Sequence, residues 1–413
     1  MLGMGDTEFR VGGKEYVSDL VNVISKAFKS FRSLSSEVME ELMSIDEGVK
    51  EGFIAVAYVG GEAASAAQVV IRDLMLGESS LRIAGLANVG TKPGFRGRGL
   101  ATSLLKEVIN YLVSKGYYLM MLFAGEGSKA FRIYRKLGFE VIWRFKKLKC
   151  YGVTASVVNE YLSKLGRGGT ELVNEGMIKE LSNSYVSNSL REGLGLTVKR
   201  SINYWRKLVR YNPYYTWFLS RSSKYWLVSD GGNSYVVGNL WSDLGLDNVK
   251  GRGGIVKEVI CSDLSTCKSL IAELLSKLFR DGAKEVVIDV PPTELISTVC
   301  EGFRCSWVSS DEVLMAKVLN PNALSKYLVD NVLSEFRCGI SEDGLIELSV
   351  GGVTYYVDPL GLMKLVLNVL TPEEAIELGY LRPTNTYFKE DLNVFSRYVS
   401  KYTYPHIWVV DRW

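Results

Sequence analysis

The stretch Val89–Ala101, with the sequence VGTKPGFRGRGLA, decides the fold of this chain. A strand-like segment, Leu81–Thr91, leads into it, and apolar residues at helical spacing follow it over Leu100–Leu112. Glycines at a strand-to-helix junction let backbone N–H groups close around an anion, and the positive end of the helix adds to the attraction. Arg96 and Arg98 add two full positive charges. The stretch therefore predicts a pyrophosphate site.

The elements on either side of this stretch fit one α/β domain. After it, Tyr117–Phe123 is an apolar run typical of a buried strand, a helix carrying Tyr134 ends at Gly138, and Glu140–Lys149 predicts a last strand. Before it we expect two helices and a hairpin turning at Gly60-Gly61; the helices are Tyr16–Phe31 and Ser35–Met43, and the strands are Phe53–Val59 and Ala63–Met75.

Two motifs in this segment resemble those of the GNAT acetyltransferases. Arg96-x-x-Gly99-x-Ala101, with Val89 and Pro93 ahead of it, resembles their acetyl-CoA loop. Tyr134-x-x-x-Gly138-Phe139 resembles their closing motif, in which the tyrosine faces the thioester. The resemblance implies an α/β fold of the mixed-sheet, α+β kind and acetyl-CoA as co-substrate. It assigns cofactor binding to Val89, Gly90, Thr91, Arg96, Gly97, Arg98, Gly99, Leu100, Ala101 and Thr102.

Length and charge narrow the class of protein. The chain has 413 residues, which suggests two or three domains, and its net charge of +3 gives no reason to expect nucleic acid or a membrane as partner. No apolar run reaches membrane-spanning length, and the first residues lack the pattern of a signal peptide. We therefore expect a cytoplasmic protein.

The cysteines predict no metal site. The six cysteines include no Cys-x-x-Cys pair and the chain has a single histidine, so zinc is not expected. Cys261 and Cys267, or Cys300 and Cys305, are close enough in sequence to form a disulfide, and buried thiols are the alternative. Because Gln68 is the only glutamine, one such bridge would fit a thermophilic source.

The second segment, residues 151–318, predicts an internal duplication. Its expected elements are the helices Val157–Leu165, Thr170–Leu190 and Ser265–Phe279 and the strands Tyr235–Leu240, Ile255–Cys261 and Glu285–Val290, which repeat the strand–helix–strand order of residues 1–150. The junction Val259–Leu264 lacks a glycine-arginine cradle, and Gly251-Arg252-Gly253-Gly254 precedes its strand, where a hairpin turn is expected. A second GNAT-like domain here should be degenerate and should not bind CoA.

Aromatic residues are dense between Tyr204 and Trp226 in this second segment. They could stack bases, with Arg200 and Lys207 among the cations that would hold phosphates. Tryptophans and tyrosines at this density more often fill cores and domain interfaces, so we expect no nucleic-acid partner.

The third segment, residues 319–413, completes a second resemblance. Val313–Leu324 leads into it as a strand, and it contains a predicted hairpin (Leu345–Val350 and Val353–Val357), a helix (Leu360–Leu370) and a helix start at Thr371. This layout resembles a sterol-carrier-like domain. The whole chain then resembles the Eis-type (enhanced intracellular survival) N-acetyltransferases, with residues 1–150 as the catalytic domain, 151–318 as the degenerate one and 319–413 as the third. The resemblance implies a homo-oligomer, a hexamer or a trimer.

The resemblance also implies an activity, the transfer of an acetyl group from acetyl-CoA to a primary amine. Tyr134 suits the general acid, because a phenol can protonate the departing thiolate. Ile83–Thr91 contains no acid to act as base, and the Eis-type resemblance points instead to the terminal carboxylate of Trp413, with His406 as a minor candidate. Two alternatives remain. One is a protein N-terminal acetyltransferase; the other is a non-catalytic CoA sensor or apolar-ligand carrier.

The acceptor amine is left open by the sequence. Some Eis-type members use acids near the end of the first helix to bind polycationic aminoglycosides, whereas residues 27–31 here read AFKSF. A small amine or a lysine side chain is therefore at least as well supported as an aminoglycoside.

Overall fold

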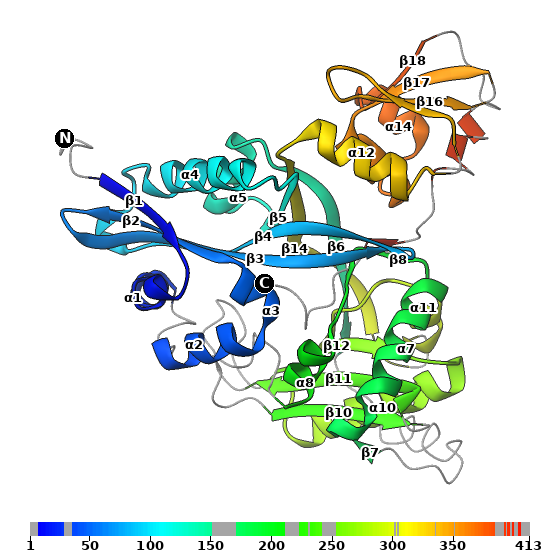
Figure 1. Ribbon diagram of the computed structural model, residues 1–413. Helices are drawn as coiled ribbons and strands as arrows, with labels where there is room; N and C mark the ends of the chain where they lie inside the picture. Colours follow the sequence, from blue (N-terminus) through cyan, green and yellow to red (C-terminus); the bar gives the residue numbers. More distant parts are fainter. Residues whose placement is uncertain are drawn as a thin grey trace.

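The computed structural model describes residues 7–28, 35–150, 171–210, 223–229, 232–241, 253–300, 303, 305–334, 336–350, 352–384 and several positions between 392 and 405. Within these residues, thirteen strands form one large mixed sheet and four form a small antiparallel sheet. Figure 1 shows helices on both faces of the large sheet, with the small sheet and its helices to one side. The predicted mixed α/β fold is confirmed.

The first 150 residues follow the predicted order of elements. The strands are β1 (Thr7–Gly12), β2 (Phe53–Val59), β3 (Glu62–Leu76), β4 (Ser79–Thr91), β5 (Leu119–Gly125) and β6 (Glu140–Cys150). The helices are α1 (Val17–Ala27), α2 (Ser36–Ile45), α3 (Glu47–Glu51), α4 (Leu100–Ser114) and α5 (Lys129–Lys136). The β2–β3 hairpin turns at Gly60 and Gly61, whose positive φ angles of 57° and 78° explain the Gly-Gly pair.

Helices α4 and α1 pack on opposite faces of this part of the sheet (Figure 1). The periodic leucines of α4, including Leu104 and Leu112, are fully buried, and each such side chain contributes about 1.5–3 kcal/mol. On the other face, α1 buries Leu20, Val23 and Ile24. Two apolar faces per strand explain why β2 to β5 read as nearly continuous apolar runs.

The second segment supplies all of the remaining strands of the large sheet. Its elements are β7 (Glu171–Leu172), α7 (Ile178–Arg191), β8 (Leu194–Gly195), β9 (Thr197–Val198), α8 (Ile202–Arg210), β10 (Ser223–Ser229), β11 (Ser234–Trp241), β12 (Gly253–Ile260), α10 (Leu264–Arg280), β13 (Val286–Ile288), α11 (Glu294–Cys300) and β14 (Cys305–Val318). The helix expected over Thr170–Leu190 begins only at Ile178. The helix expected over Val157–Leu165 and the Gly251-Arg252 turn lie outside the described residues.

Among the described residues, aromatic side chains of the second segment lie in its core, as predicted. Tyr204, Trp205 and Trp226 are buried, and Trp205 packs edge-on against Tyr235 at 6.3 Å. Arg200 lies within this core and is bonded to the buried carboxylate of Glu258. Arg200 therefore cannot hold a phosphate at the surface.

Strands β6 and β14 join the two halves of the large sheet, because each changes its partners along its length. The first half of β6 pairs with Val313–Ala316 of β14, and its second half pairs with Cys305–Ser309. Strand β14 also pairs with β5 over Glu312–Val318, while the last residues of β6 pair with β13. The strand between β5 and β6 therefore comes from the far end of the second segment, which sequence analysis did not predict.

The third segment forms the small sheet and a short helical layer. Its elements are α12 (Pro321–Asn331), β15 (Cys338–Ile340), β16 (Ile346–Val350), β17 (Val353–Val357), α13 (Pro359–Val366), α14 (Pro372–Glu377), β18 (Leu381–Pro383) and β19 (Tyr404–Pro405), the last of which pairs with β8. The predicted hairpin and the helix start at Thr371 are confirmed, and Thr371 forms a full capping box with Glu374.

A buried ionic cluster ties the second segment to the first. Asp46, which caps the N-terminus of α3, accepts two hydrogen bonds from Arg72 of β3 at 2.8 and 2.9 Å and one from Lys207 of α8 at 2.6 Å. Burial alone would raise the pKa of Asp46, but the two cations outweigh it and hold the pKa below its usual range. Removing one partner of such a cluster costs about 3–5 kcal/mol, so the two segments are firmly joined here.

The cysteines form two disulfides among the described residues, where sequence analysis expected one at most. The predicted Cys261–Cys267 bond is confirmed. The Cys300–Cys305 pairing is wrong: Cys305 is bonded to Cys150, because β14 begins directly opposite the end of β6, with the two Cα atoms 4.1 Å apart.

Within the described part of the chain, no helix is both long enough and apolar enough to cross a membrane.

Candidate active site

An opening between β4 and β5 lies beside the predicted acetyl-CoA loop. These parallel strands pair over only three residues, Ala84–Leu86 with Met120–Leu122. Beyond this pairing β4 runs on to Thr91 and β5 to Gly125. The two strands therefore stop pairing with each other at their carboxyl ends, which is where ligands usually bind to parallel strands.

A bulge in β4 lies at this opening. Gln68 of β3 pairs with Ala87 and Ala66 pairs with Gly90, so Asn88 and Val89 together face a single residue of β3. Asn88 has a positive φ of 52°, and its amide donates to the Gln68 side chain at 2.7 Å. A bulge leaves one residue out of the ladder and bends the strand, here directly before the predicted acetyl-CoA loop.

The loop after β4 is built by its glycines. Gly97 and Gly99 both have positive φ angles, near 79° and 78°, which only glycine adopts without strain. Arg96 lies back across the loop and donates to the backbone oxygens of Thr91 at 3.1 Å and Ala27 at 2.9 Å, so it fastens the loop to the end of α1. Arg98 remains exposed and donates to Gly94.

The first turn of α4 is open to an anion. Gly99 is its N-cap and has no side chain to accept from the following N–H groups. No acidic residue occurs from Ile83 to Lys106, while Lys92, Arg96 and Arg98 lie in the loop. The helix end is therefore positive through both its dipole and its neighbouring side chains.

Tyr134 lies in the same buried cluster as residues of β4, α4 and β5. Its side chain is 7% exposed, and its ring packs edge-on against Phe139 at 5.9 Å. The cluster also contains Leu86, Leu104 and Leu122. Burial raises the pKa of Tyr134 to about 12, so the phenol keeps its proton at neutral pH and is able to donate it.

Comparison with known proteins agrees with this geometry. Residues 8–142 match the family model described as an acetyltransferase (GNAT) domain. Residues 8–142 are thus similar to a GNAT acetyltransferase domain. No curated protein sequence matches the chain.

Solved structures extend the similarity of fold beyond the GNAT domain. A GCN5-related N-acetyltransferase from Kribbella flavida matches with a TM-score of 0.67 at 14% identity, and the match covers 100% of both chains. One from Anabaena variabilis ATCC 29413 matches at 0.66 and 15%, over 98% of this chain and 100% of that one. Eis1 from Mycobacterium abscessus matches at 0.57 and 14%, over 99% and 100%. At these identities the likeness shows a shared fold.

The predicted site residues fall into two groups. The predicted ligands from Val89 to Thr102 lie together at the end of β4, in the loop and in the first turn of α4, beside the opening of the GNAT domain. Trp413 and His406 lie outside the described residues, so the predicted base stays a prediction. Lys92 is paired with Glu62 at 2.8 Å, which keeps that carboxylate engaged at the edge of β3.

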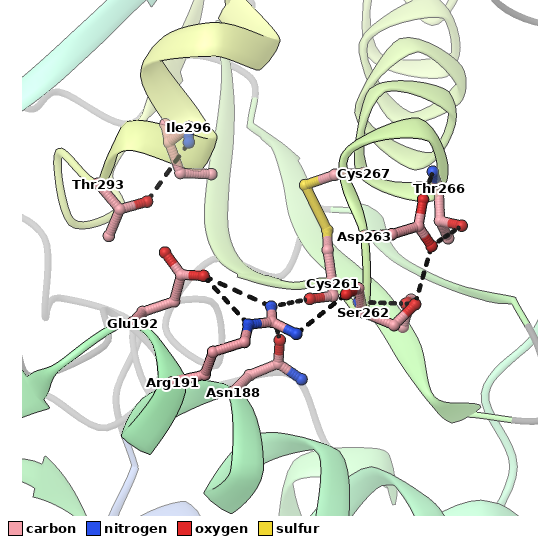
Figure 2. Close-up of a disulfide and its surroundings, with 11 residues drawn as sticks. Asn188, Arg191, Glu192, Cys261, Ser262, Asp263, Thr266, Cys267, Thr293 and Ile296 are labelled. Atoms are coloured by element: carbon pink, nitrogen blue, oxygen red, sulfur yellow. Dashed lines mark hydrogen bonds and ion pairs between the residues drawn. A yellow bond between two sulfur atoms is a disulfide. The ribbon is translucent and has the colours of Figure 1, made fainter.

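A second junction at which a strand leads into a helix, from β12 to α10, has the same order of elements as the β4–α4 junction. The residues at the start of its helix are different (Figure 2). Strands β12 and β13 are parallel and also pair over three residues. Asp263 caps α10 by accepting from the backbone N–H of Thr266 at 2.9 Å, and this hydrogen bond and that of the Thr266 side chain lower the pKa of Asp263. The helix end is therefore already capped by a carboxylate.

The end of α7 covers this second opening. Arg191 donates to the backbone oxygens of Cys261 and Ser262, and Figure 2 shows its guanidinium lying between α7 and the end of β12. The cavity that remains, lined by Asn188, Glu192, Leu194, Val259, Ile260, Cys261, Pro291, Thr293, Leu295 and Ile296, holds about 20 Å³. That volume fits a water molecule and not a pantetheine arm.

Sequence analysis missed the residues that support the site from a distance. Gln68 and Ser65, both on β3, hold the β4 bulge and the Gly90-Thr91 backbone, with Ser65 donating to the oxygen of Gly90 at 2.8 Å. Both are polar residues within an otherwise apolar strand, and this could have indicated their role. A buried polar side chain needs a hydrogen-bond partner, so each predicts a specific contact.

Proposed function

We propose that this protein transfers the acetyl group of acetyl-CoA to a primary amine, either a small amine or a lysine side chain. The observation that carries the proposal is the opening between β4 and β5. The uncapped start of α4 at Gly99 follows β4, and the buried phenol of Tyr134 belongs to the same apolar cluster as Leu86 of β4 and Leu122 of β5. A GNAT domain supplies the family context.

Residues of the opening account for the binding of acetyl-CoA. The N–H groups of the first turn of α4 and the loop glycines would hold the pyrophosphate, with Arg98 adding charge. The backbone of β4 from Val89 to Thr91, past the end of its pairing with β5, would hydrogen-bond the pantetheine arm. A backbone N–H at the β4 bulge would donate a hydrogen bond to the thioester oxygen and stabilise the negative charge that develops there. This is the usual role of an oxyanion hole.

The chemical step then requires one proton donor and one proton acceptor. The amine nitrogen attacks the carbonyl carbon, the new C–N bond forms, and the C–S bond breaks. Tyr134 gives its proton to the departing CoA thiolate, and a base takes the proton that the amine releases. For that base we propose the carboxylate of Trp413, on the Eis-type resemblance of the sequence.

This assignment of the base has its own test. Deleting Trp413, or adding two glycines after it, should abolish turnover and leave the affinity for acetyl-CoA within about twofold, because only the proton acceptor is displaced. Turnover and calorimetric binding are measured on the same preparations. Unchanged turnover in the extended variant would refute the role of Trp413.

The other two segments are proposed to complete an Eis-type architecture. The strand–helix–strand order of β12, α10 and β13 supports a degenerate GNAT-like unit over residues 151–318. The β16–β17 hairpin with α13 supports a sterol-carrier-like unit over residues 319–413. An assembly of several subunits, a trimer or a hexamer, belongs to the same proposal.

The acetyltransferase proposal is tested by release of free CoA from acetyl-CoA. Polyamines, aminoglycosides and lysine peptides serve as acceptors, and Arg96→Ala is the control because Arg96 fastens the loop to α1. CoA release with at least one amine class, lost in Arg96→Ala, is expected. Binding of acetyl-CoA without release for any amine would favour a non-catalytic CoA-binding protein.

A further inference from the structure

A polar cluster connects the third segment to the turn that follows the Tyr134 helix. Lys364 of α13 donates to the Glu140 carboxylate of β6 at 2.8 Å and to the Tyr380 hydroxyl at 2.6 Å. The Tyr380 hydroxyl in turn donates to Glu140. Two residues of the third segment therefore bind one carboxylate of the catalytic domain.

The cluster is closely packed and partly buried, with the Glu140 side chain 37% exposed. The Lys364 side chain is 6% exposed, and its ammonium lies 4.0 Å from the centre of the Tyr380 ring. Tyr380 rests on α13 at Gly361, where a side chain would place its Cβ 2.6 Å from the Cβ of Tyr380. Because Lys364 and Tyr380 bind Glu140 and also contact each other, the three side chains form a connected network that holds Glu140 against α13.

The charges of the cluster suit a permanent contact. Burial would raise the pKa of Glu140, but the hydrogen bonds from Lys364 and Tyr380 outweigh it and lower the pKa. Burial and then the hydrogen bond to Glu140 raise the pKa of Tyr380. At neutral pH Glu140 is therefore an ionised carboxylate and Tyr380 a neutral phenol.

A rigid turn links Glu140 to Tyr134. The backbone N–H of Phe139 donates to the carbonyl of Tyr134 at 3.0 Å, and that of Gly138 donates to Arg135 at 3.0 Å. Gly138 takes the left-handed conformation that this helix ending requires, with φ of 84°. Glu140 is the next residue along, so fixing its carboxylate fixes the end of α5.

We infer that Lys364 and Tyr380 are positioning residues for the acetyl transfer: they hold Glu140, and through the turn at Gly138 they set Tyr134 against the thioester. The inference rests on the proposed function, in which Tyr134 is the proton donor. By this inference the third segment contributes to acetyl transfer without binding a ligand of its own and independently of the Trp413 carboxylate.

The test compares two tyrosines of the third segment. Tyr380→Phe removes the hydroxyl that binds Glu140. Tyr356→Phe removes an exposed hydroxyl that binds a glutamate within the third segment itself, Glu347, and is the matched control. In the full-length protein, Tyr380→Phe should lower kcat about tenfold while the KM for acetyl-CoA stays within about twofold, because small misplacements of a proton donor slow only the chemical step. Tyr356→Phe should change neither constant.

Hydrogen exchange provides a readout that does not need activity. Backbone amides of residues 129–140 should exchange faster in Tyr380→Phe than in the wild type or in Tyr356→Phe. A loss of kcat with unchanged exchange, or faster exchange with unchanged kcat, would overturn the inference. If the wild type transfers no acetyl group, the proposed function fails, and so does the role of Lys364 and Tyr380 in catalysis. The exchange rates alone then decide whether Tyr380 holds the end of α5 in place.

Discussion

The junctions β4–α4 and β12–α10 are built on the same plan and present opposite surfaces. In both, a strand pairs with its parallel neighbour over three residues and then leads through a loop into a long helix. The first helix begins at Gly99 without a side-chain cap, and the second begins at Asp263, whose carboxylate already occupies its N–H groups. Topology provides the opening, and the residue at the N-cap decides whether an anion can use it.

The helices that follow the second strand of each pair differ as well. Helix α5 carries Tyr134, whereas α11, which follows β13, has the sequence ELISTVC and no tyrosine. Under the proposed function the first junction thus combines an anion site with a proton donor, and the second has neither an uncapped helix start nor a tyrosine in the following helix. The comparison predicts one active centre per chain.

The largest expected effect is the loss of the proton donor that distinguishes α5 from α11. Tyr134→Phe keeps the ring and its contact with Phe139, so acetyl-CoA should bind as before while kcat falls about 10²- to 10³-fold. Steady-state kinetics and calorimetry measure the two quantities. A variant that retains wild-type kcat would show that Tyr134 is a packing residue.

The next effect comes from giving the first junction the cap of the second. Gly99→Asp places a carboxylate at the N-cap of α4 and should weaken acetyl-CoA binding about 100-fold, because it blocks the N–H groups and repels the pyrophosphate. Gly99→Asn is the control, since it imposes the same strain at a φ of 78° without the charge. Equal losses in the two variants would show that backbone strain, not charge, is responsible.

The converse change removes the charge of the helix cap at the second junction and tests whether acetyl-CoA can then bind there. Asp263→Asn removes the charge there, yet acetyl-CoA should still bind with one site per chain, because Arg191 and the end of α7 leave room only for water. Titration calorimetry gives the stoichiometry for wild type and variant. Two sites in either protein would contradict the assignment of the second junction as closed.

The smallest expected effect is on stability. Asp263→Ala removes the cap of α10 and should cost about 1 kcal/mol at pH 7. Because folding lowers the pKa of Asp263, its contribution is present above the unfolded pKa of about 3.9 and is lost as the pH falls through the folded value. Urea denaturation at neutral and at acid pH should therefore give a difference between wild type and variant that shrinks with acid.

Local patterns in the sequence were sufficient to predict the first junction and the strands around it. The apolar run of β2, the glycines after β4 and the leucine spacing of α4 each express a local conformational preference, and the structure confirms all three. Helix α1 ends at Ala27, four residues before the predicted end. Ends of helices depend on tertiary contacts that periodicity does not contain.

Contacts between distant residues could not be predicted in this way. The partner of Cys305 is Cys150, 155 residues away, and no spacing rule connects them. The same holds for Glu140 and Tyr380, which are 240 residues apart. Such pairs depend on the order of strands in the sheet, which a single sequence does not reveal.

The sharing of β6 and β14 between the two halves of the sheet has a consequence for synthesis. When residues 1–150 leave the ribosome, β5 and β6 have no strand between them, since that place belongs to Glu312–Val318. Their edges stay unpaired until more than 160 further residues have been made. Residues 1–150 thus cannot complete their part of the sheet alone, and during translation their unpaired strand edges favour aggregation.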